Sequence, residues 1–337
     1  QTMSYTIDLF RGQVDAERSP LRFAVFVSFF PQLVAGPIVR ARDFLPQLRK
    51  DQRPTANMVV SGTCFVLWGF VLKCVLADSL ALVTDLRFET PEAHHSLSLF
   101  LGILFYAFQI YGDFAGYSLI AIGLARILGF DFPLNFDRPY FSRSFSEFWQ
   151  RWHISLSSWL RDYLYIPLGG NRKGVRRTTI NLLLTMLLGG LWHGAAWTFV
   201  VWGGLHGVYL CGQRWLAAVK LPSPLRIAVP ALLVFGLTLF AWIFFRAESL
   251  PKAIDYLSRL LTNGDWTFGA VTQKFHVLKG VGLILLIAGC EALSFRINFW
   301  KLAERHRWLY GAFVAICLWM LALLGTFGAD TFIYFQF

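Results

Sequence analysis

The chain has 337 residues, of which 56% are hydrophobic, 17% aromatic and only 15% charged. Soluble proteins average about 25% charged residues, so this composition excludes an ordinary soluble enzyme and indicates an integral membrane protein. The formal net charge of +11 arises from basic residues in short groups between apolar stretches, as in the loops of membrane proteins. We therefore expect contacts with membrane lipid and no nucleic-acid partner.

Seven apolar stretches come close to, or exceed, the roughly 20 residues that a helix needs to cross the hydrocarbon layer. They lie at residues 22–38, 57–83, 96–128, 178–212, 226–246, 277–296 and 309–328. No repeat or linker divides the chain, so we expect a single all-α domain over residues 1–337. The opening QTMSYTIDLFRG follows no visible signal peptide, so the sequence is interpreted as a chain whose beginning is missing.

The stretch at 96–128 is too long for one crossing and contains the sequence YGDFAGY. We expect it to hold two segments or one bent helix. Tyr111 and Asp113 of this sequence are buried polar candidates. Two readings are open for them: hydrogen bonds to backbone near a bend, or contact with a substrate.

The section at 141–170 mixes aromatic and aliphatic residues with Ser, Arg, Glu and Asp at helical spacing. Such spacing predicts a helix that lies in the membrane interface or re-enters the protein, and a wall of an internal cavity. His153 lies here, with Ser157 one helical turn later and Asp162 beyond it. A Ser-His-Asp hydrolase is conceivable from these residue types, but G-x-S-x-G is absent, so we favour polar groups that line a cavity.

The stretch at 178–212 is also too long for one crossing and contains LLGGLWHG and WGGLHG. His193 has apolar neighbours on both sides, where burial favours the neutral imidazole that a general base needs. The alternative is a structural histidine bonded to a neighbouring helix. His206 follows 13 positions later and is interpreted as structural, because one continuous helix would separate the two rings by about 20 Å.

Other features carry less chemistry. Residues 249–265 form an amphipathic stretch that begins at Ser249 and ends at Asn263 and Gly264, which predicts a surface helix. The five cysteines lack paired spacing, and no HExxH motif or phosphate-binding loop occurs, so we expect no bound metal and no bound cofactor. Four histidines lie in polar loops or beside basic residues and are expected to be solvated: His94, His95, His276 and His306.

Long joint motifs make the chain resemble the membrane-bound O-acyltransferase family, most closely its bacterial alginate O-acetylation branch. The matching stretches are SFFPQLVAGPIVR at 28–40, YGDFAGYSLIAIGLARILGFDFPLNFDRPY at 111–140, SFSEFWQRWHISLSSWLRDYLYIPLGGNRKG at 144–174, NLLLTMLLGGLWHGAAWTFVVWGGLHG at 181–207 and FIYFQF at 332–337. Family members begin with further hydrophobic segments, so the chain resembles a member that lacks its amino-terminal helices.

The resemblance implies a fold and a site. The fold is a ring of tilted transmembrane helices, with interfacial or re-entrant helices, around a central funnel in a bacterial inner membrane. The essential histidine maps onto His193 and a second functional histidine onto His153. In the mechanism that we expect, His193 is the general base, His153 orients the acyl group or stabilises the oxyanion, Trp192 and Trp197 wall the cavity, and Asp113 polarises the donor or the acceptor.

The resemblance also implies an acyl thioester donor, with acetyl-coenzyme A (acetyl-CoA) as the substrate that we expect, and periplasmic O-acetyltransferase partner proteins beside polysaccharide synthase and export machinery. Candidate contacts for the donor's phosphates are Arg172 and Lys173, with Arg176 and Arg177 beside them. We prefer to read this basic group as a determinant of topology. Alternatives from other classes are a transporter of acyl groups or lipid-linked sugars and a non-catalytic scaffold of an export complex.

Overall fold

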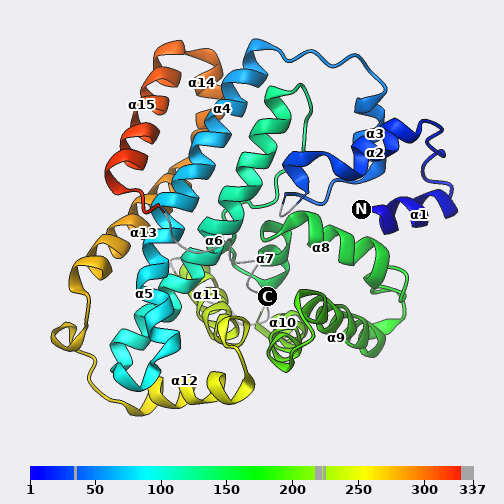
Figure 1. Ribbon diagram of the computed structural model, residues 1–337. Helices are drawn as coiled ribbons and strands as arrows, with labels where there is room; N and C mark the ends of the chain where they lie inside the picture. The colour runs from blue at the N-terminus through cyan, green and yellow to red at the C-terminus, as the bar shows by residue number, and fades with distance from the viewer. Residues whose placement is uncertain (34–35, 217–221, 223–224, 328–337) are drawn as a thin grey trace.

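The computed structural model describes residues 1–33, 36–216, 222 and 225–327. Every regular element in these residues is a helix, which confirms the all-α prediction (Figure 1). The predicted motif FIYFQF at 332–337 lies outside the described residues, as does residue 328.

Among the described residues, five helical stretches are long and apolar enough to cross a membrane. They are the continuous run of α4 (Ala56–Phe70), η2 (Val71–Ala77) and α5 (Asp78–Glu89), and the single helices α6 (Ser96–Ile127), α11 (Leu225–Arg246), α13 (Lys274–Ser294) and α15 (Arg307–Leu324). They confirm five of the seven predicted stretches. The chain is therefore described as a polytopic membrane protein.

The run from α4 to α5 packs along α6, and glycines bring the two backbones together. A methyl group on Gly69 would lie 2.6 Å from the Gly116 carbonyl oxygen, and one on Gly116 would lie 2.7 Å from that of Gly69. Close approach through small residues is how membrane helices gain packing energy. The glycines of YGDFAGY therefore serve a helix contact. Helix α6 runs through this sequence as one element, so of the two predicted alternatives the division into two segments is wrong.

The predicted span at 22–38 is wrong. The described part of this stretch contains the short helix α2 (Pro20–Ser28) and the 3₁₀ turn η1 (Phe30–Gln32), and residues 34–35 lie outside the described residues. The proline of this turn cannot donate the hydrogen bond that a continuing helix requires, and the side-chain amide of Gln32 folds back to donate to the Phe26 carbonyl at 2.8 Å.

The amino-terminal region instead packs through aromatic rings. Phe29 and Phe44 lie 5.0 Å apart between ring centroids, and both contact Phe130 and Phe132 from the segment after α6. Two further helices complete this region, α1 (Thr2–Phe10) and α3 (Ala41–Leu48).

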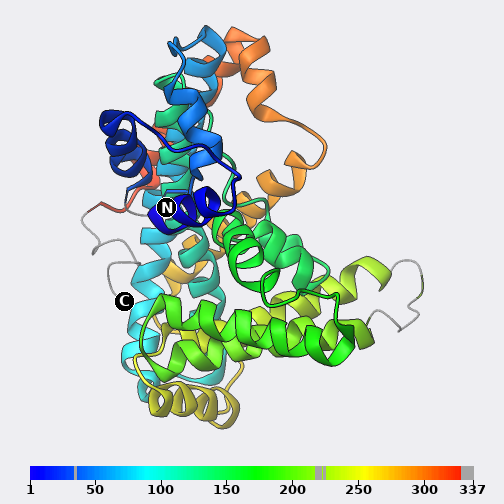
Figure 2. The same ribbon diagram turned by 90° about the vertical axis from the view of Figure 1, so that its right-hand side faces the viewer.

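The predicted stretch at 178–212 forms a helical hairpin of α9 (Gly174–His193) and α10 (Trp197–Leu216). Gly190 and Gly203 face each other, because a methyl group on either one would meet the backbone of the opposite helix. Neither helix is among the five candidate spans. In Figure 2 the hairpin runs across the direction of the long helices.

The section at 141–170 forms short helices rather than a span. These are η4 (Pro139–Phe141), α7 (Phe145–Arg151), α8 (Ile154–Leu160) and the π-helical turn η5 (Arg161–Tyr165). The predicted surface helix is confirmed as α12 (Leu250–Thr262), whose first turn is capped by the Ser249 hydroxyl. The remaining elements are η3 (Pro91–Ala93), η6 (Phe268–Ala270) and α14 (Phe299–Arg305).

Candidate active site

His153 occupies the sharp corner between α7 and α8. Its backbone is left-handed, with φ 42° and ψ 56°, a conformation that is uncommon and costs free energy for a residue with a Cβ. The side chain is 3% exposed. Its ring lies 4.6 Å, centroid to centroid, from the ring of Phe114 on α6.

The segment between α6 and η4 holds His153 through Asn135. The distance from His153 Nδ1 to Asn135 Oδ1 is 3.1 Å. The same oxygen accepts hydrogen bonds from the Ser155 backbone N–H at 3.1 Å and from the Ser155 hydroxyl at 2.9 Å. The Asn135 Nδ2 donates to the Ser118 hydroxyl of α6 at 3.0 Å. A fully buried polar network thus fixes the histidine to two other parts of the chain.

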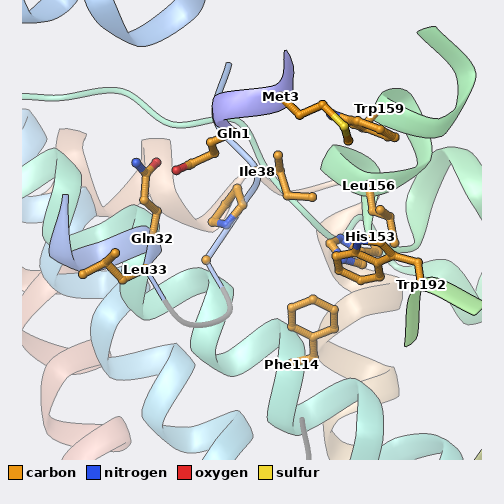
Figure 3. Close-up of a pocket in the computed structure, with 12 residues that line it drawn as sticks. Gln1, Met3, Gln32, Leu33, Ile38, Phe114, His153, Leu156, Trp159 and Trp192 are labelled. Carbon is orange, nitrogen blue, oxygen red and sulfur yellow. The ribbon is translucent and has the colours of Figure 1, made fainter. Parts of the chain in front are cut away.

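A first cavity of about 340 Å³ opens beside His153. Figure 3 shows Phe114 rising toward His153 from below, Leu156 and Trp159 on α8, and Gln32 on the opposite side. Trp192, the last residue before His193, completes the wall next to His153. This volume is at the lower end of the range of small-molecule sites, which is about 300 to 1,000 Å³.

His193 is the last residue of α9, beside Gly194 at the hairpin's turn. Its ring lies between 5.1 and 5.3 Å, centroid to centroid, from the rings of Trp192, Trp202 and Phe245. Burial holds the pKa of His153 well below its ordinary value, and the neighbouring His193 lowers it further. The two histidines, 40 positions apart in sequence, therefore lie close enough to interact.

Helix α8 separates the first cavity from a second cavity of about 650 Å³. His153, Leu156 and Trp159 line the first cavity, at the spacing of one helix face. Ser157 and Arg161 line the second, together with residues of the α9 and α10 hairpin. This geometry confirms the prediction that the section at 141–170 forms a cavity wall.

A model of the membrane-bound O-acyltransferase family matches residues 15–249 of this chain. The chain belongs to the membrane-bound O-acyltransferase family. The matched range contains both histidines, Asn135 and the residues that line the second cavity.

Relatives place the chain in the alginate-type branch. It is 47% identical over 289 residues, 85% of this chain and 57% of the relative, to the probable alginate O-acetylase AlgI of Azotobacter vinelandii. It is 39% identical to the peptidoglycan O-acetyltransferase of Helicobacter pylori, over 72% of this chain and 46% of the relative. For the teichoic acid D-alanyltransferase of Bacillus subtilis the identity is 31%, over 69% and 63%. The chain thus spans only 46% to 63% of the length of these relatives.

The structure gives Asp113 and Tyr111 partners away from both cavities. Asp113 Oδ1 lies 2.7 Å from Lys73 Nζ of η2, which also donates to Asp78 Oδ1 at 2.8 Å. The Tyr111 hydroxyl donates to the carboxylate of Glu291 on α13. Neither residue lines either cavity. Their contact with a substrate stays a prediction. The geometry shows a structural role for both, since each side chain links α6 to a neighbouring element.

Other predicted site residues are dispersed. Trp197 begins α10 with 73% of its surface exposed and does not line the first cavity, whereas Trp192 does. His206 is fully buried on α10 and lies in neither cavity wall. The basic residues Arg172, Lys173, Arg176 and Arg177 are exposed at the start of α9, directly after Asn171, which lines the second cavity.

Sequence reasoning did not identify Asn135, Phe114 or Gln32. Asn135 lies in PLNFDRPY, a proline-containing stretch that is typical of a loop, and a lone loop asparagine gives no sign of its partner. Phe114 looks like one more apolar residue of a span. The signal for Asn135 was its place within a long family motif, where a polar residue among apolar ones indicates a buried contact.

Proposed function

We propose that this protein is an O-acyltransferase that moves an acetyl group from a cytoplasmic thioester toward hydroxyl groups of an exported polysaccharide. The observation that carries the proposal is the convergence of His153 and His193 beside a cavity, in a chain of the membrane-bound O-acyltransferase family. The names of the relatives, which include alginate and peptidoglycan O-acetylases, support acetyl as the group that is moved.

The chemistry requires one base and good positioning. His193 takes the proton from an acceptor hydroxyl as its oxygen attacks the thioester carbonyl, and the imidazolium returns that proton to the departing thiolate. The C–O bond forms, the C–S bond breaks, and the products are an ester and a thiol. The rings of Trp192, Trp202 and Phe245 surround His193, and such an apolar environment keeps its imidazole neutral and able to act as a base.

Two cavities on two faces of α8 fit two substrates. We assign the second cavity to the arm of the acyl donor, since Ser157, Asn171 and Thr185 supply hydroxyl and amide groups along its wall. Acetyl-CoA is the donor that we propose. The exposed Arg172 and Lys173 at its rim would meet the donor's phosphates. The first cavity, lined by His153, is then left for the acceptor.

The setting that we propose is a bacterial inner membrane. The names of the relatives concern the modification of alginate, peptidoglycan and teichoic acid. Polymers of this kind lie outside the cytoplasm, so periplasmic O-acetyltransferase partners and polysaccharide synthase and export proteins would receive the acetyl group or supply the acceptor.

Substitution of His193 tests the proposal. Protein in lipid nanodiscs is incubated with radiolabelled acetyl-CoA and alginate oligosaccharides, and acetyl ester and free thiol are measured. His193→Ala should reduce both products by at least about 100-fold, the low end of what a general base contributes. Retained turnover in His193→Ala would overturn the assignment of the base.

Two further arms separate the alternatives. His206→Ala, at equal protein concentration, should retain more turnover than His193→Ala. A reversed order would move the catalytic role to His206. If wild-type protein forms neither ester nor thiol but binds or moves substrate across liposomes, the transporter or scaffold hypothesis replaces the enzyme.

A further inference from the structure

Asn135 is buried, with 1% of its surface exposed, and its side chain has a fixed orientation. The Ser155 backbone N–H, which can only donate, lies 3.1 Å from the atom assigned as Oδ1. The opposite amide atom lies 3.0 Å from the Ser118 hydroxyl, which can accept. Exchange of the two atoms would set one N–H group against another, so the carbonyl oxygen faces His153.

This orientation decides which nitrogen of His153 carries the proton. Asn135 Oδ1 only accepts hydrogen bonds, and His153 Nδ1 lies 3.1 Å away. A favourable contact therefore requires a hydrogen on Nδ1. The Ser155 hydroxyl lies 2.9 Å from the same oxygen and 3.5 Å from Nδ1, so it donates to Asn135 rather than to the ring. In a neutral imidazole the lone pair is then on Nε2.

The backbone of the same residue also holds the corner. The Ile154 N–H donates to the Asn135 carbonyl at 2.8 Å, directly after the left-handed His153. Asn135 thus contacts three consecutive residues: the ring of His153, the backbone N–H of Ile154, and the backbone N–H and hydroxyl of Ser155. Several contacts from one residue stabilise the strained backbone of His153.

We propose that Asn135 is a positioning residue that holds His153 in the tautomer protonated on Nδ1, so that Nε2 accepts a hydrogen bond from a second hydroxyl of the saccharide acceptor, next to the one that reacts, in the first cavity. The inference rests on the proposed function and assigns a role within it. An oxyanion needs an N–H donor, and this tautomer places the N–H against Asn135. His153 therefore orients the acceptor through this neighbouring hydroxyl, and the proton of the reacting hydroxyl stays available to His193.

The groups around His153 limit what else can set its protonation. From α9, His193 acts on it as a like charge when both are protonated. From α6, Phe114 presents an uncharged ring. The charged residues on the flanking segments pair among themselves: Asp137 with Arg138, and Arg151 with Glu147. Asn135 is therefore the neutral hydrogen-bond partner whose replacement can change the protonation of the His153 ring.

Asn135→Asp gives the sharpest test, because the carboxylate keeps every donor that the amide oxygen has and Ser118 can turn its hydroxyl to donate. The new charge stabilises the imidazolium, so the pKa of His153 should rise by about 1 to 3 pH units. The acidic limb of kcat/KM for acetyl-CoA and alginate oligosaccharide should move to higher pH with it. Ring-¹⁵N NMR of selectively labelled histidine, assigned with His153→Gln, reports the same titration without turnover.

Asn135→Leu removes the acceptor, and Asn181→Leu is its matched control. Asn181 is equally buried, but its amide donates only to the Gly170 carbonyl at 2.8 Å. Asn135→Leu should lower kcat/KM roughly 10- to 100-fold, as for other groups that orient a histidine, and should shift the His153 proton from Nδ1 toward Nε2. Asn181→Leu should leave the tautomer and the pH profile at their wild-type values.

The outcomes separate the two proposals. An unshifted His153 titration in Asn135→Asp, or an unchanged tautomer in folded Asn135→Leu, overturns the positioning role and leaves the acyltransferase assignment intact. If wild-type protein transfers no acetyl group while the NMR titration behaves as described, the function is wrong and the tautomer assignment stands. Should Asn135→Leu fail to fold, the Asn135→Asp titration decides by itself.

Discussion

His193 and His206 show why the surroundings of a residue matter more than its burial. His206 lies within 6.2 Å, centroid to centroid, of the rings of Phe145, Phe148 and Trp202, and among the described residues neither of its ring nitrogens has a hydrogen-bond partner. A buried N–H without a partner costs free energy, and His206 lines neither cavity. His193 lies at the end of α9, directly after Trp192, which lines the first cavity.

His206→Leu should therefore leave acetyl transfer close to wild type. Leucine has a similar volume and no unsatisfied donor, so the melting temperature in detergent should stay level or rise, within the roughly 1.5 kcal/mol expected of volume-conserving core changes. Differential scanning fluorimetry and the radiolabel assay measure the two effects. Loss of turnover in a fully folded His206→Leu protein would show that this histidine has a chemical role.

At the residue scale, the sequence predicted the types of residue but not their partners. The apolar neighbours of His193 were enough to single it out, whereas its proximity to His153 depends on how α8 meets the hairpin, which no periodicity encodes. Asn135 was missed because its contact needs a left-handed residue at His153, and a single histidine in a sequence gives no sign that its backbone adopts this uncommon conformation. Tyr111 and Asp113 were recognised as buried polar groups, but not the Glu291 and Lys73 that pair with them.

At the scale of elements, glycines explain which predicted breaks are real. The 96–128 stretch stays one helix because Gly116 faces Gly69 of α4, and the 178–212 stretch divides because Gly194 ends α9. In the sequence, a glycine that packs against another helix cannot be told from a glycine that ends one. Only the neighbouring helix distinguishes a packing glycine from a break, so the number of elements could not be obtained from the sequence.

Gly116→Ala should destabilise the protein. The added methyl group would lie 2.7 Å from the Gly69 carbonyl oxygen, so α4 and α6 must separate, at a cost of about 1 to 3 kcal/mol for an overpacked contact. Gly282→Ala on α13 is the control, since nothing lies within 4 Å of its added methyl group. Thermal unfolding in the same detergent should show a lower melting temperature for the first variant only. Equal melting temperatures would contradict the close contact.

The π-helical turn η2 carries the membrane core's clearest ionic contact. Lys73 lies between Asp78 and Asp113, whose side chains are 12% and 3% exposed. Lys73→Met would leave two buried carboxylates without a counter-charge, and we expect a loss of about 3 to 5 kcal/mol. Unfolding in mixed micelles measures it.

A triple variant with Lys73→Met, Asp78→Asn and Asp113→Asn removes all three charges and should recover most of that loss. If Lys73→Met unfolds like wild type, the ionic contact does not stabilise the helix pair. Asp113→Asn also tests the substrate role: activity per folded molecule should be retained if Asp113 serves η2, and lost if it contacts substrate.

At the scale of the whole molecule, the two ends of the long helices differ in charge. One end is formed by the start of α4, the end of α6 and helix α14, in the upper part of Figure 1. Its basic residues outnumber its acidic ones; they are Arg49, Lys50, Arg53, Arg126, Arg296, Lys301, Arg305 and Arg307, against Asp51, Asp131 and Glu304. At the opposite end, around α12, the numbers of basic and acidic residues are similar. The acidic residues there are Asp85, Glu89, Glu92, Glu248, Asp255 and Asp265. An excess of lysine and arginine marks the cytoplasmic side of a bacterial membrane protein.

The basic end should therefore face the cytoplasm, and cysteine labelling can determine it. The five native cysteines, all free thiols, are first replaced in a background that keeps acetyl transfer. Arg53→Cys then reports the basic end and Glu92→Cys the opposite end, because both positions are exposed. A membrane-impermeant maleimide should label Arg53→Cys in inverted vesicles and Glu92→Cys in spheroplasts. The reverse pattern would contradict the charge-based orientation and place α12 in the cytoplasm, on the same side of α8 as α10 and the second cavity, so the labelling also decides which cavity a cytoplasmic donor can enter (Figure 1).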